Sequence, residues 1–280
     1  CPIAAWSEQG RGAVRWLPAA SNTVSGLLAL KQGDVLYATG DPAWGRVSPQ
    51  GKNRFQNTGK IADFRYTSEK QFLLSKLGTK LQFGYQYDSK FPTLFDLTER
   101  KLLLPPIHSL GFTAPDTSSL AIKGWKNTTS PTLNGKILSL SKNETSFSLA
   151  ISPDQQQFLL GTHWYLRLFD KNGTQRWQQA VPSVVWRVNI AANNKVAVAA
   201  LGDGTIRWYR LNDGVELLAF YPHPDKKRWV LWTPEGYYDA SAGAEDLIGW
   251  HLNRGKDQAA DFYSIGKFRE QYYRPDVIDQ

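Results

Sequence analysis

Short apolar runs alternate with polar turns along most of the chain. Residues 147–153 form one run, Asp154 turns the chain, and further runs follow at 157–161 and 164–169. The same order of runs and turns returns between residues 186 and 209. Short strands at regular spacing with turn residues between them are typical of all-β proteins. Helical periodicity is absent until the last part of the chain.

A hairpin pattern also recurs: apolar or aromatic residues, a polar turn with Gly or Asn, and apolar residues again. Asn-Gly and Asp-Gly pairs favour tight hairpin turns because both residues accept positive φ. The six copies lie at residues 5–16, 44–55, 94–103, 132–138, 168–177 and 208–218. Their turns are about 35 to 50 residues apart, which is the blade period of β-propellers.

A chain of 280 residues has room for about seven four-stranded blades of about 40 residues each. We therefore expect an all-β fold, a β-propeller of seven (six to eight) four-stranded blades, with residues 228 to about 253 as the final blade. The first hairpin is an incomplete blade. It either pairs with strands from the C-terminal end and closes the ring, or its missing half lies upstream.

Residues 147–220 resemble two consecutive WD40-type blades, and the stretch FDKNGTQRW at 169–177 also resembles quinoprotein-like propellers. The Gly-His and Trp-Asp dipeptides of strong WD40 repeats are missing, so the repeats are divergent. A quinone-cofactor site is not expected, because neither a calcium carboxylate site nor a basic cofactor clamp is identifiable.

Residues 228–278, here called the signature segment, resemble the closing blade and tail of bacterial WD40 proteins that are often joined to caspase-like peptidase domains. The resemblance implies that its distinctive residues act in structure or in partner binding. These residues are Trp232, Pro234, Glu235, Gly236, Tyr237, Tyr238, Asp239, Gly249, Trp250, Asn253 and Arg254. No peptidase dyad is expected here, because Cys1 is the only cysteine.

Near the end of the chain, the spacing of the apolar residues changes from that of strands to that of a helix. Phe262, Ile265, Phe268 and Tyr272 are three or four residues apart, which predicts one face of a short helix, with an ordered coil as the alternative. Pro275 ends the helix, because the residue before a proline avoids the helical region. We expect a WD40-like propeller over residues 1–255 and a tail helix and linker over 256–280. The tail is either a latch that seals the ring or a joint to a following domain.

The formal net charge is +8, and a basic chain can bind nucleic acid or an anionic membrane. Here Lys and Arg are spread along the sequence, and the densest short cluster, at 226–228, follows Asp225. We interpret the charge as a solvated surface and expect no nucleic-acid partner.

Cys1 is the only cysteine, and the sequence contains no Met. The chain is thus expected to be a processed or excised product, without an internal disulfide or a cysteine-cluster metal site. A Cys at position 1 resembles the mature end of a bacterial lipoprotein, where it carries the lipid; an arbitrary domain cut is the alternative. We therefore expect a periplasmic or membrane-anchored lipoprotein, or else a cytoplasmic protein, with Cys1 as the sole membrane tether.

Histidines and carboxylates give no catalytic pattern. No pair of the four histidines, His108, His163, His223 and His251, has helical metal-ligand spacing, and we expect His251 to pack within the signature segment. The acidic residues Glu235, Asp239, Glu245 and Asp246 sit among turn residues. They are expected to bind backbone amides, or Arg254 and Lys256, rather than to act in acid–base catalysis.

The sequence has no nucleophile elbow, phosphate loop or dinucleotide-binding glycine motif. We therefore expect no catalytic residue, no metal and no cofactor. The first hypothesis is a non-catalytic scaffold that binds another protein or presents an adjacent domain, in a bacterial envelope or signalling protein, as the regulatory part of a caspase-like peptidase system. The second is a quinoprotein-like envelope lipoprotein that assists outer-membrane protein assembly. The third is an enzyme with a site in a central channel.

Overall fold

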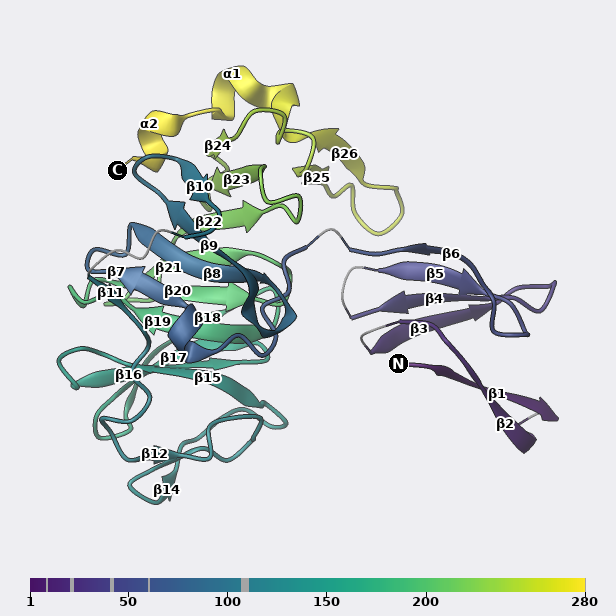
Figure 1. Cartoon of the computed structure of the whole chain (residues 1–280), viewed down its shortest axis with the longest axis horizontal. Helices are drawn as coiled ribbons and strands as arrows, with labels where there is room; N and C mark the ends of the chain where they lie inside the picture. The colour runs from purple at the N-terminus through teal and green to yellow at the C-terminus, as the bar shows by residue number, and fades with distance from the viewer. Residues whose placement is uncertain (9, 21–22, 41–42, 60, 107–110, 280) are drawn as a thin grey trace. The chain divides into compact units, whose positions relative to one another are not determined.

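The computed structural model describes residues 1–8, 10–20, 23–40, 43–59, 61–106 and 111–279. The chain divides into two compact units, Cys1–Lys60 and Ile61–Gln280. Strands account for most of the regular structure in both units, which confirms the expected all-β class (Figure 1). The predicted boundary at residue 255 lies inside the second unit, where the strands on its two sides pair with each other.

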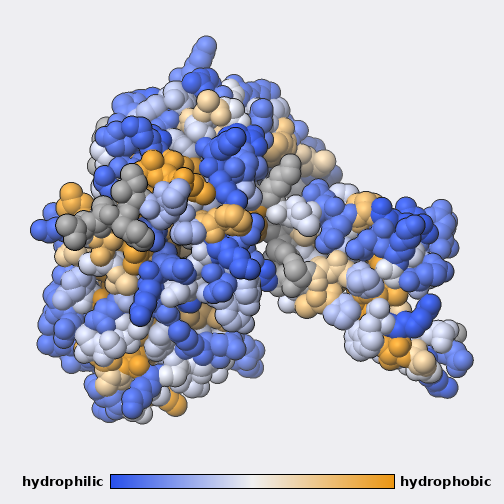
Figure 2. Space-filling model, in the orientation of Figure 1, coloured by the Kyte–Doolittle hydropathy of each residue, from blue (hydrophilic) through white to orange (hydrophobic). Residues whose placement is uncertain are grey.

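The first unit contains a hairpin and a four-stranded antiparallel sheet. The hairpin strands are β1 (Ile3–Glu8) and β2 (Arg11–Leu17); the sheet strands, in spatial order, are β3 (Val24–Ala29), β4 (Val35–Thr39), β5 (Trp44–Val47) and β6 (Asn53–Asn57). Ile3 and Leu17 pack against Tyr37 and Val47 on one face of the sheet. Hydrophobic residues interrupt the mostly hydrophilic surface of the face shown in Figure 2.

The second unit begins with two smaller antiparallel sheets. The first has the spatial order β10-β9-β8-β7-β11, and the second is a three-stranded meander, β12-β13-β14. Two 3₁₀ turns, η1 (Glu69–Gln71) and η2 (Tyr87–Ser89), flank strands of the first sheet. The strands are β7 (Leu73–Ser75), β8 (Lys80–Gln86), β9 (Lys90–Asp96), β10 (Lys101–Leu103), β11 (Phe112–Thr113), β12 (Ile122–Lys123), β13 (Thr132–Leu133) and β14 (Lys136–Ile137).

Two longer sheets follow, and both begin with a four-stranded meander. The first sheet consists of β15 (Ser146–Ile151), β16 (Gln157–Thr162), β17 (Tyr165–Asp170) and β18 (Gln175–Ala180). The second consists of β19 (Val185–Ile190), β20 (Val196–Leu201), β21 (Ile206–Arg210), β22 (Glu216–Pro222), β23 (Trp229–Trp232) and β24 (Tyr238–Ala240). The chain ends with the hairpin β25 (Gly249–Leu252) and β26 (Asp261–Ser264), then η3 (Ile265–Phe268), α1 (Arg269–Tyr272) and α2 (Pro275–Ile278).

The β15–β18 and β19–β22 meanders repeat the same register. Arg167 lies opposite Leu160 in the first, and Arg207 lies opposite Ala199 in the second. Each meander has a bulge in the pairing of its third and fourth strands. The repeat predicted from the turns is thus present in the strand pairing itself.

The sheets of the second unit pack face to face because side chains alternate between the two faces of a strand. Alternate residues of β20 illustrate this: Ala197 and Ala199 face the β15–β18 sheet, whereas Val198 and Ala200 face the β7–β11 sheet. The opposite face of β15–β18 packs against β12–β14. The resulting order of layers is β12–β14, β15–β18, β19–β24 and β7–β11. Figure 1 shows β12 and β14 beside β15 and β16, and β23 and β24 near the C-terminal helices.

All six predicted hairpins form, as β1–β2, β5–β6, β9–β10, β13–β14, β17–β18 and β21–β22. The predicted final blade does not form a sheet of its own, because β23 pairs with β22 and extends the preceding sheet. Ring closure by the first hairpin is not seen either: β1 and β2 form a two-stranded sheet, and the strands in the described residues form no closed sheet.

The predicted tail helix is only partly correct. Phe262 lies in strand β26 and is 67% exposed, whereas Ile265 is buried. The helical part of the predicted pattern is limited to η3 and α1. As predicted, α1 ends before Pro275, but Pro275 also begins a separate short helix, α2. The hairpin hydrogen bonds of β25 and β26 hold the first part of this pattern in extended conformation. The apolar spacing therefore does not produce one helix face.

One buried ion pair joins the loop before β15 to strand β17. Glu144 is fully buried and Arg167 nearly so. Nε of Arg167 donates to one carboxylate oxygen of Glu144 at 2.8 Å, and Nη2 donates to the other at 2.6 Å. Thr162 and the backbone of Ser141 also donate to this carboxylate. A buried ion pair is tolerated only when its hydrogen-bonding groups are satisfied, and this carboxylate has four donors.

We predict that Glu144→Gln destabilises the protein by about 3 kcal/mol, because removing one partner leaves the other charge buried without compensation. The matched control is Glu99→Gln, since Glu99 pairs with Lys101 at 3.3 Å and both side chains are more than half exposed. The control should cost less than about 1 kcal/mol. Urea unfolding measures both values; equal losses in the two variants would contradict the assignment.

The same carboxylate predicts a dependence of stability on pH. Burial alone would raise the pKa of Glu144, but the hydrogen bonds from Arg167, Thr162 and Ser141 lower it overall below its ordinary value of 4.5. A group with a lowered folded-state pKa contributes stability above its unfolded pKa and loses it as pH falls through the folded one. The stability difference between wild type and Glu144→Gln should therefore shrink on acidification below pH 4.5. Urea titrations at several pH values measure it, and a constant difference would contradict the mechanism.

Candidate functional site

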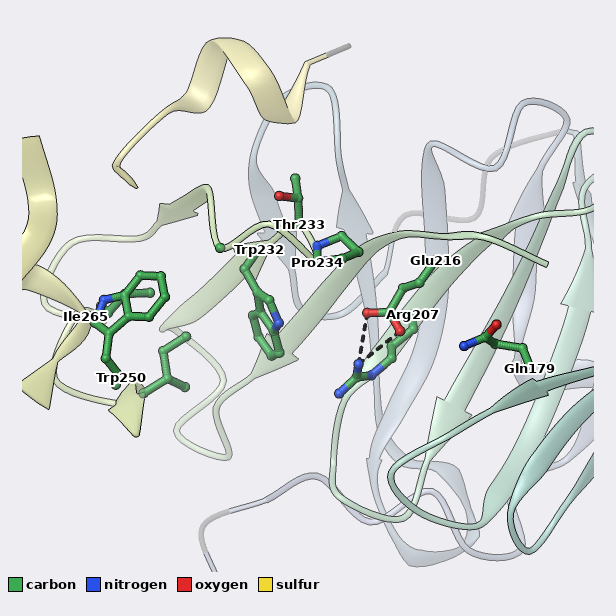
Figure 3. A pocket seen from close by; sticks show the side chains of 11 residues that line it. Gln179, Arg207, Glu216, Trp232, Thr233, Pro234, Trp250 and Ile265 are labelled. Carbon is green, nitrogen blue, oxygen red and sulfur yellow. Dashed lines mark hydrogen bonds and ion pairs between the residues drawn. The ribbon is translucent and has the colours of Figure 1, made fainter. Parts of the chain in front are cut away.

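A cavity of about 580 Å³ lies along strands β21, β22 and β23 of the β19–β24 sheet. Five of the eleven distinctive residues of the signature segment line it: Trp232, Pro234, Gly236, Gly249 and Trp250. The other lining residues are Gln179, Arg207, Glu216, Thr233, Ile248 and Ile265. We call this cavity the tryptophan groove. Figure 3 shows Trp232 between Trp250 and the Arg207–Glu216 pair, with Gln179 of β18 beyond that pair.

The Arg207–Glu216 pair of the groove is satisfied from within the chain. Nη1 of Arg207 donates to both carboxylate oxygens of Glu216, at 2.9 and 3.1 Å. Nε of Arg207 donates to the Thr205 hydroxyl, and Nη2 lies 3.4 Å from Asp203. The guanidinium carbon also lies 5.9 Å from the centre of the Trp232 ring. Two carboxylates surround one guanidinium, so this part of the groove does not favour a further anion.

Trp250 forms the opposite wall and is held from two sides. Its ring lies 4.6 Å from the Tyr272 ring and 6.0 Å from the Phe268 ring, both in the C-terminal segment. On the other side is Gly236, at φ +92°, where an added Cβ would lie 2.5 Å from the indole. Glycine is therefore required at position 236 for two reasons: it accepts the positive φ, and it has no side chain to collide with Trp250.

Tyr237, Tyr238 and Asp239 lie outside the groove and attach the C-terminal segment to the sheet. The Tyr237 ring lies 6.0 Å from the Tyr272 ring. The Tyr238 hydroxyl donates to Glu245 at 3.1 Å, and Tyr238 forms a parallel β-bridge with Tyr273. The buried carboxylate of Asp239 accepts a hydrogen bond from Arg100 at 2.9 Å, and Arg100 also binds Asp279. These contacts make this part of the signature segment structural.

Glu235, Asn253 and Arg254 are exposed and do not line the groove. Asn253 accepts a hydrogen bond from the backbone of Gly255 within a turn, and Arg254 pairs with Asp261. The predicted partners of the acidic residues are correct in part. Asp239 accepts a hydrogen bond from the backbone of Ala240, as predicted, and also binds Arg100, whereas Glu245 binds Arg269. Both arginines are distant in sequence, and local spacing does not reveal them.

The histidines do not form a site. His251 is exposed, so its predicted packing role is wrong: its neighbour Trp250 packs inward, and adjacent strand residues point to opposite faces. His223 is buried, with Nδ1 2.9 Å from Asp225, and His163 meets Phe147 edge to face at 4.7 Å. His108 lies outside the described residues. Across the described ranges, no three His, Cys, Asp or Glu side chains gather as a metal-binding group.

Sequence reasoning missed six lining residues of the groove, of which three lie outside the signature segment: Gln179, Arg207 and Glu216. A signal was present for Arg207, which occupies the same register position as Arg167 in the preceding repeat. In that repeat the fourth strand supplies Gln175 at 2.6 Å from the guanidinium, and here it supplies Glu216. The contribution of β18, through Gln179, depends on the packing of two sheets and has no local signal.

Comparison with known proteins gives no family. No protein-family model and no curated protein matches the sequence. Among solved structures, the chain is similar to the computationally designed Ika8 protein, with a TM-score of 0.31, 16% identity, and coverage of 79% of this chain and 74% of that one. It is also similar to the Cps50 (Swd1) β-propeller domain of Myceliophteria thermophila, with a TM-score of 0.30, 10% identity, and coverage of 79% and 86%.

Both TM-scores are low, so the description of the fold rests on the sheets themselves. No helix in the part of the chain that the structure describes is long and apolar enough to cross a membrane. Cys1 is exposed and carries a free thiol.

We predict that Gly236→Ala displaces Trp250 and destabilises the protein by about 1 kcal/mol or more beyond backbone strain. Gly243→Ala is the matched control, because Gly243 also has positive φ, at +72°, but an added Cβ there meets no atom within 4 Å. It should show only the strain, about 1–2 kcal/mol. Unfolding measurements and NMR of fluorotryptophan-labelled protein, with Trp250 assigned by Trp250→Phe, test this. Equal losses and an unshifted Trp250 resonance would contradict the packing.

Proposed function

We propose that the protein is a non-catalytic, propeller-type scaffold that binds an extended segment of a partner protein in the tryptophan groove. The observation that carries the proposal is the groove itself, with two half-buried indoles beside an internally neutralised ion pair. Tryptophan and arginine are the residues that most often dominate binding energy at protein interfaces. Repeated four-stranded meanders with the blade period support the propeller assignment.

The dimensions of the groove suit a peptide segment. Its volume of about 580 Å³ can take a few side chains. It extends from Gln179, on an edge strand of one sheet, to Trp250, on a separate hairpin. Edge strands offer unpaired backbone groups to an added extended segment. The apolar walls provide the binding surface, and the charged floor excludes partners that place an anion over Glu216.

The non-catalytic part of the proposal rests on the chemistry of the groove. Its single carboxylate, Glu216, is bound by Arg207 through both oxygens, so its charge is already compensated. A general base must instead reach the proton of a substrate. Activity against hydrolase substrates that is lost in Glu216→Gln would show that the third hypothesis, an enzyme, is correct.

The finer assignment is also a proposal. A bacterial envelope or signalling role, as the regulatory part of a caspase-like peptidase system, is supported only by the sequence resemblance of the signature segment. The alternative is an envelope lipoprotein that assists outer-membrane protein assembly, and the exposed thiol of Cys1 is accessible to a lipid. The full open reading frame, and mass spectrometry of the natural N-terminus after membrane fractionation, distinguish the two.

We predict that peptides selected by display on the wild-type protein lose at least about tenfold in affinity for Trp232→Ala, the loss typical of a hot-spot residue. Gln179→Arg, which changes the opposite end of the groove at an edge strand, should weaken the same peptides. Trp164→Ala is the matched control, because Trp164 is 46% exposed and does not line the groove.

Fluorescence anisotropy measures the affinities, and urea unfolding shows that each variant folds. Selected peptides that bind both groove variants as tightly as the wild type would contradict the proposed site.

A further inference from the structure

A second cavity, of about 530 Å³, lies at the beginning of the strands β15 and β19. Three aromatic side chains line it: Tyr66, Phe147 and Trp186. The remaining lining residues are Ser68, Glu69, Lys126, Asn127 and Arg187. Phe147 and Trp186 meet edge to face at 5.2 Å, and Tyr66, which is 69% exposed, packs on Tyr87 at 5.0 Å. The cavity is distinct from the tryptophan groove and shares no lining residue with it.

Arg187 gives this cavity an incompletely neutralised cation. Its side chain is only 12% exposed. Nε donates to the backbone oxygen of Thr67, and Nη1 donates to that of Trp186. These two hydrogen bonds hold the guanidinium in place but supply no negative charge. Nη2 lies 3.9 Å from Glu69, which is too long for a hydrogen bond.

Lys126 adds a second cation to the same wall. Its ammonium lies 2.8 Å from the carboxylate of Glu69 and is itself 59% exposed. Burial would raise the pKa of Glu69, but the hydrogen bond to Lys126 and the charge of Arg187 lower it overall, so this carboxylate is ionised at neutral pH. Among the lining residues, two cations therefore share one anion, which leaves one positive charge beside three aromatic rings.

We propose that this cavity binds a carboxylate next to an aromatic side chain in an acidic peptide of a partner protein. The carboxylate meets Nη2 of Arg187 and the ammonium of Lys126, and the aromatic ring packs among Tyr66, Phe147 and Trp186. An ionised acceptor forms the stronger class of hydrogen bond with a guanidinium, and aromatic pairs add binding energy beyond the area that they bury. The proposal does not depend on the tryptophan groove, and Trp232→Ala should leave binding of the acidic peptide in the second cavity unchanged.

Glu69 provides a test that distinguishes an anion-binding cavity from a purely apolar one. It already occupies one side of the two cations, so it competes with an incoming carboxylate. Replacing it with Gln releases Lys126 and removes the like charge, whereas a purely apolar cavity would be indifferent to this change. The expected sign is unusual, because removal of a charged residue strengthens binding.

The probe is the peptide acetyl-Gly-Gly-Phe-Asp-Gly-Gly-amide, with Asn in place of Asp as its matched control. NMR titration at low salt should give at least about tenfold tighter binding for the Asp peptide, the usual worth of a hydrogen bond to a charged group. Glu69→Gln should tighten binding of the Asp peptide several-fold. Lys126→Gln and Arg187→Lys should weaken it, and Lys101→Gln, which neutralises an exposed lysine away from the cavity, should not.

Each alternative outcome overturns the proposal. Equal binding of the Asp and Asn peptides would show that no anion site exists. Unchanged or weaker binding by Glu69→Gln would show that Glu69 does not compete. Inorganic phosphate that displaces the peptide more effectively than acetate would assign the cavity to a phosphorylated ligand. Urea unfolding of Arg187→Lys checks that the variant is folded, and Lys126→Gln tests the site without changing a buried group.

Discussion

The burial of the β19–β22 meander on both faces is the constraint on which the rest of the second unit depends. Strand β20 is apolar at every position from Val196 to Leu201, and it contributes alternate residues to two different cores. Small side chains at Ala197, Ala199 and Ala200 allow the neighbouring sheets to approach closely. A strand with a polar face could not occupy this layer, because buried polar groups without partners cost about 1–3 kcal/mol each.

The same constraint decides how charged side chains are used. Arg167 and Arg207 occupy equivalent positions in consecutive repeats, next to a buried face. The first is neutralised by a buried glutamate from the preceding loop, and the second by Glu216 of the adjacent strand. On the far side of β22, the strand of Glu216, the sheet continues into β23, and this strand places Trp232 next to the guanidinium of Arg207. A position that is structural in one repeat thereby lines a cavity in the next.

Local chemistry explains which parts of the fold could be predicted from the sequence. The six hairpins are determined by turn residues and by apolar pairs on either side, and both lie within about ten residues. By contrast, the way in which the signature segment divides between two sheets and a tail is not determined by local sequence. Its strand β23 joins an existing sheet because β22 offers an open edge, and its apolar tail starts as a strand because β25 lies beside it. Pairing partners distant in sequence override periodicity in both cases.

The candidate sites show the same limit. Trp232, Gly236 and Trp250 can be singled out from the sequence because they belong to the segment that carries the family resemblance. Arg207 and Gln179, from two other sheet strands, complete the groove only after the layers pack. The second cavity has no sequence signature at all, since Tyr66, Lys126 and Arg187 come from three separate loops and strand ends.

Charge compensation separates the two cavities more sharply than their shape does. In the tryptophan groove, carboxylates of the chain itself use the donors of Arg207, so the aromatic walls remain as the attractive surface. In the second cavity, backbone carbonyls fix Arg187 without neutralising it, and Glu69 is shared with Lys126. A guanidinium held by neutral acceptors keeps its attraction for an anion, and one held by carboxylates has lost most of it. The two cavities therefore favour different classes of partner segment, although both combine tryptophan with arginine.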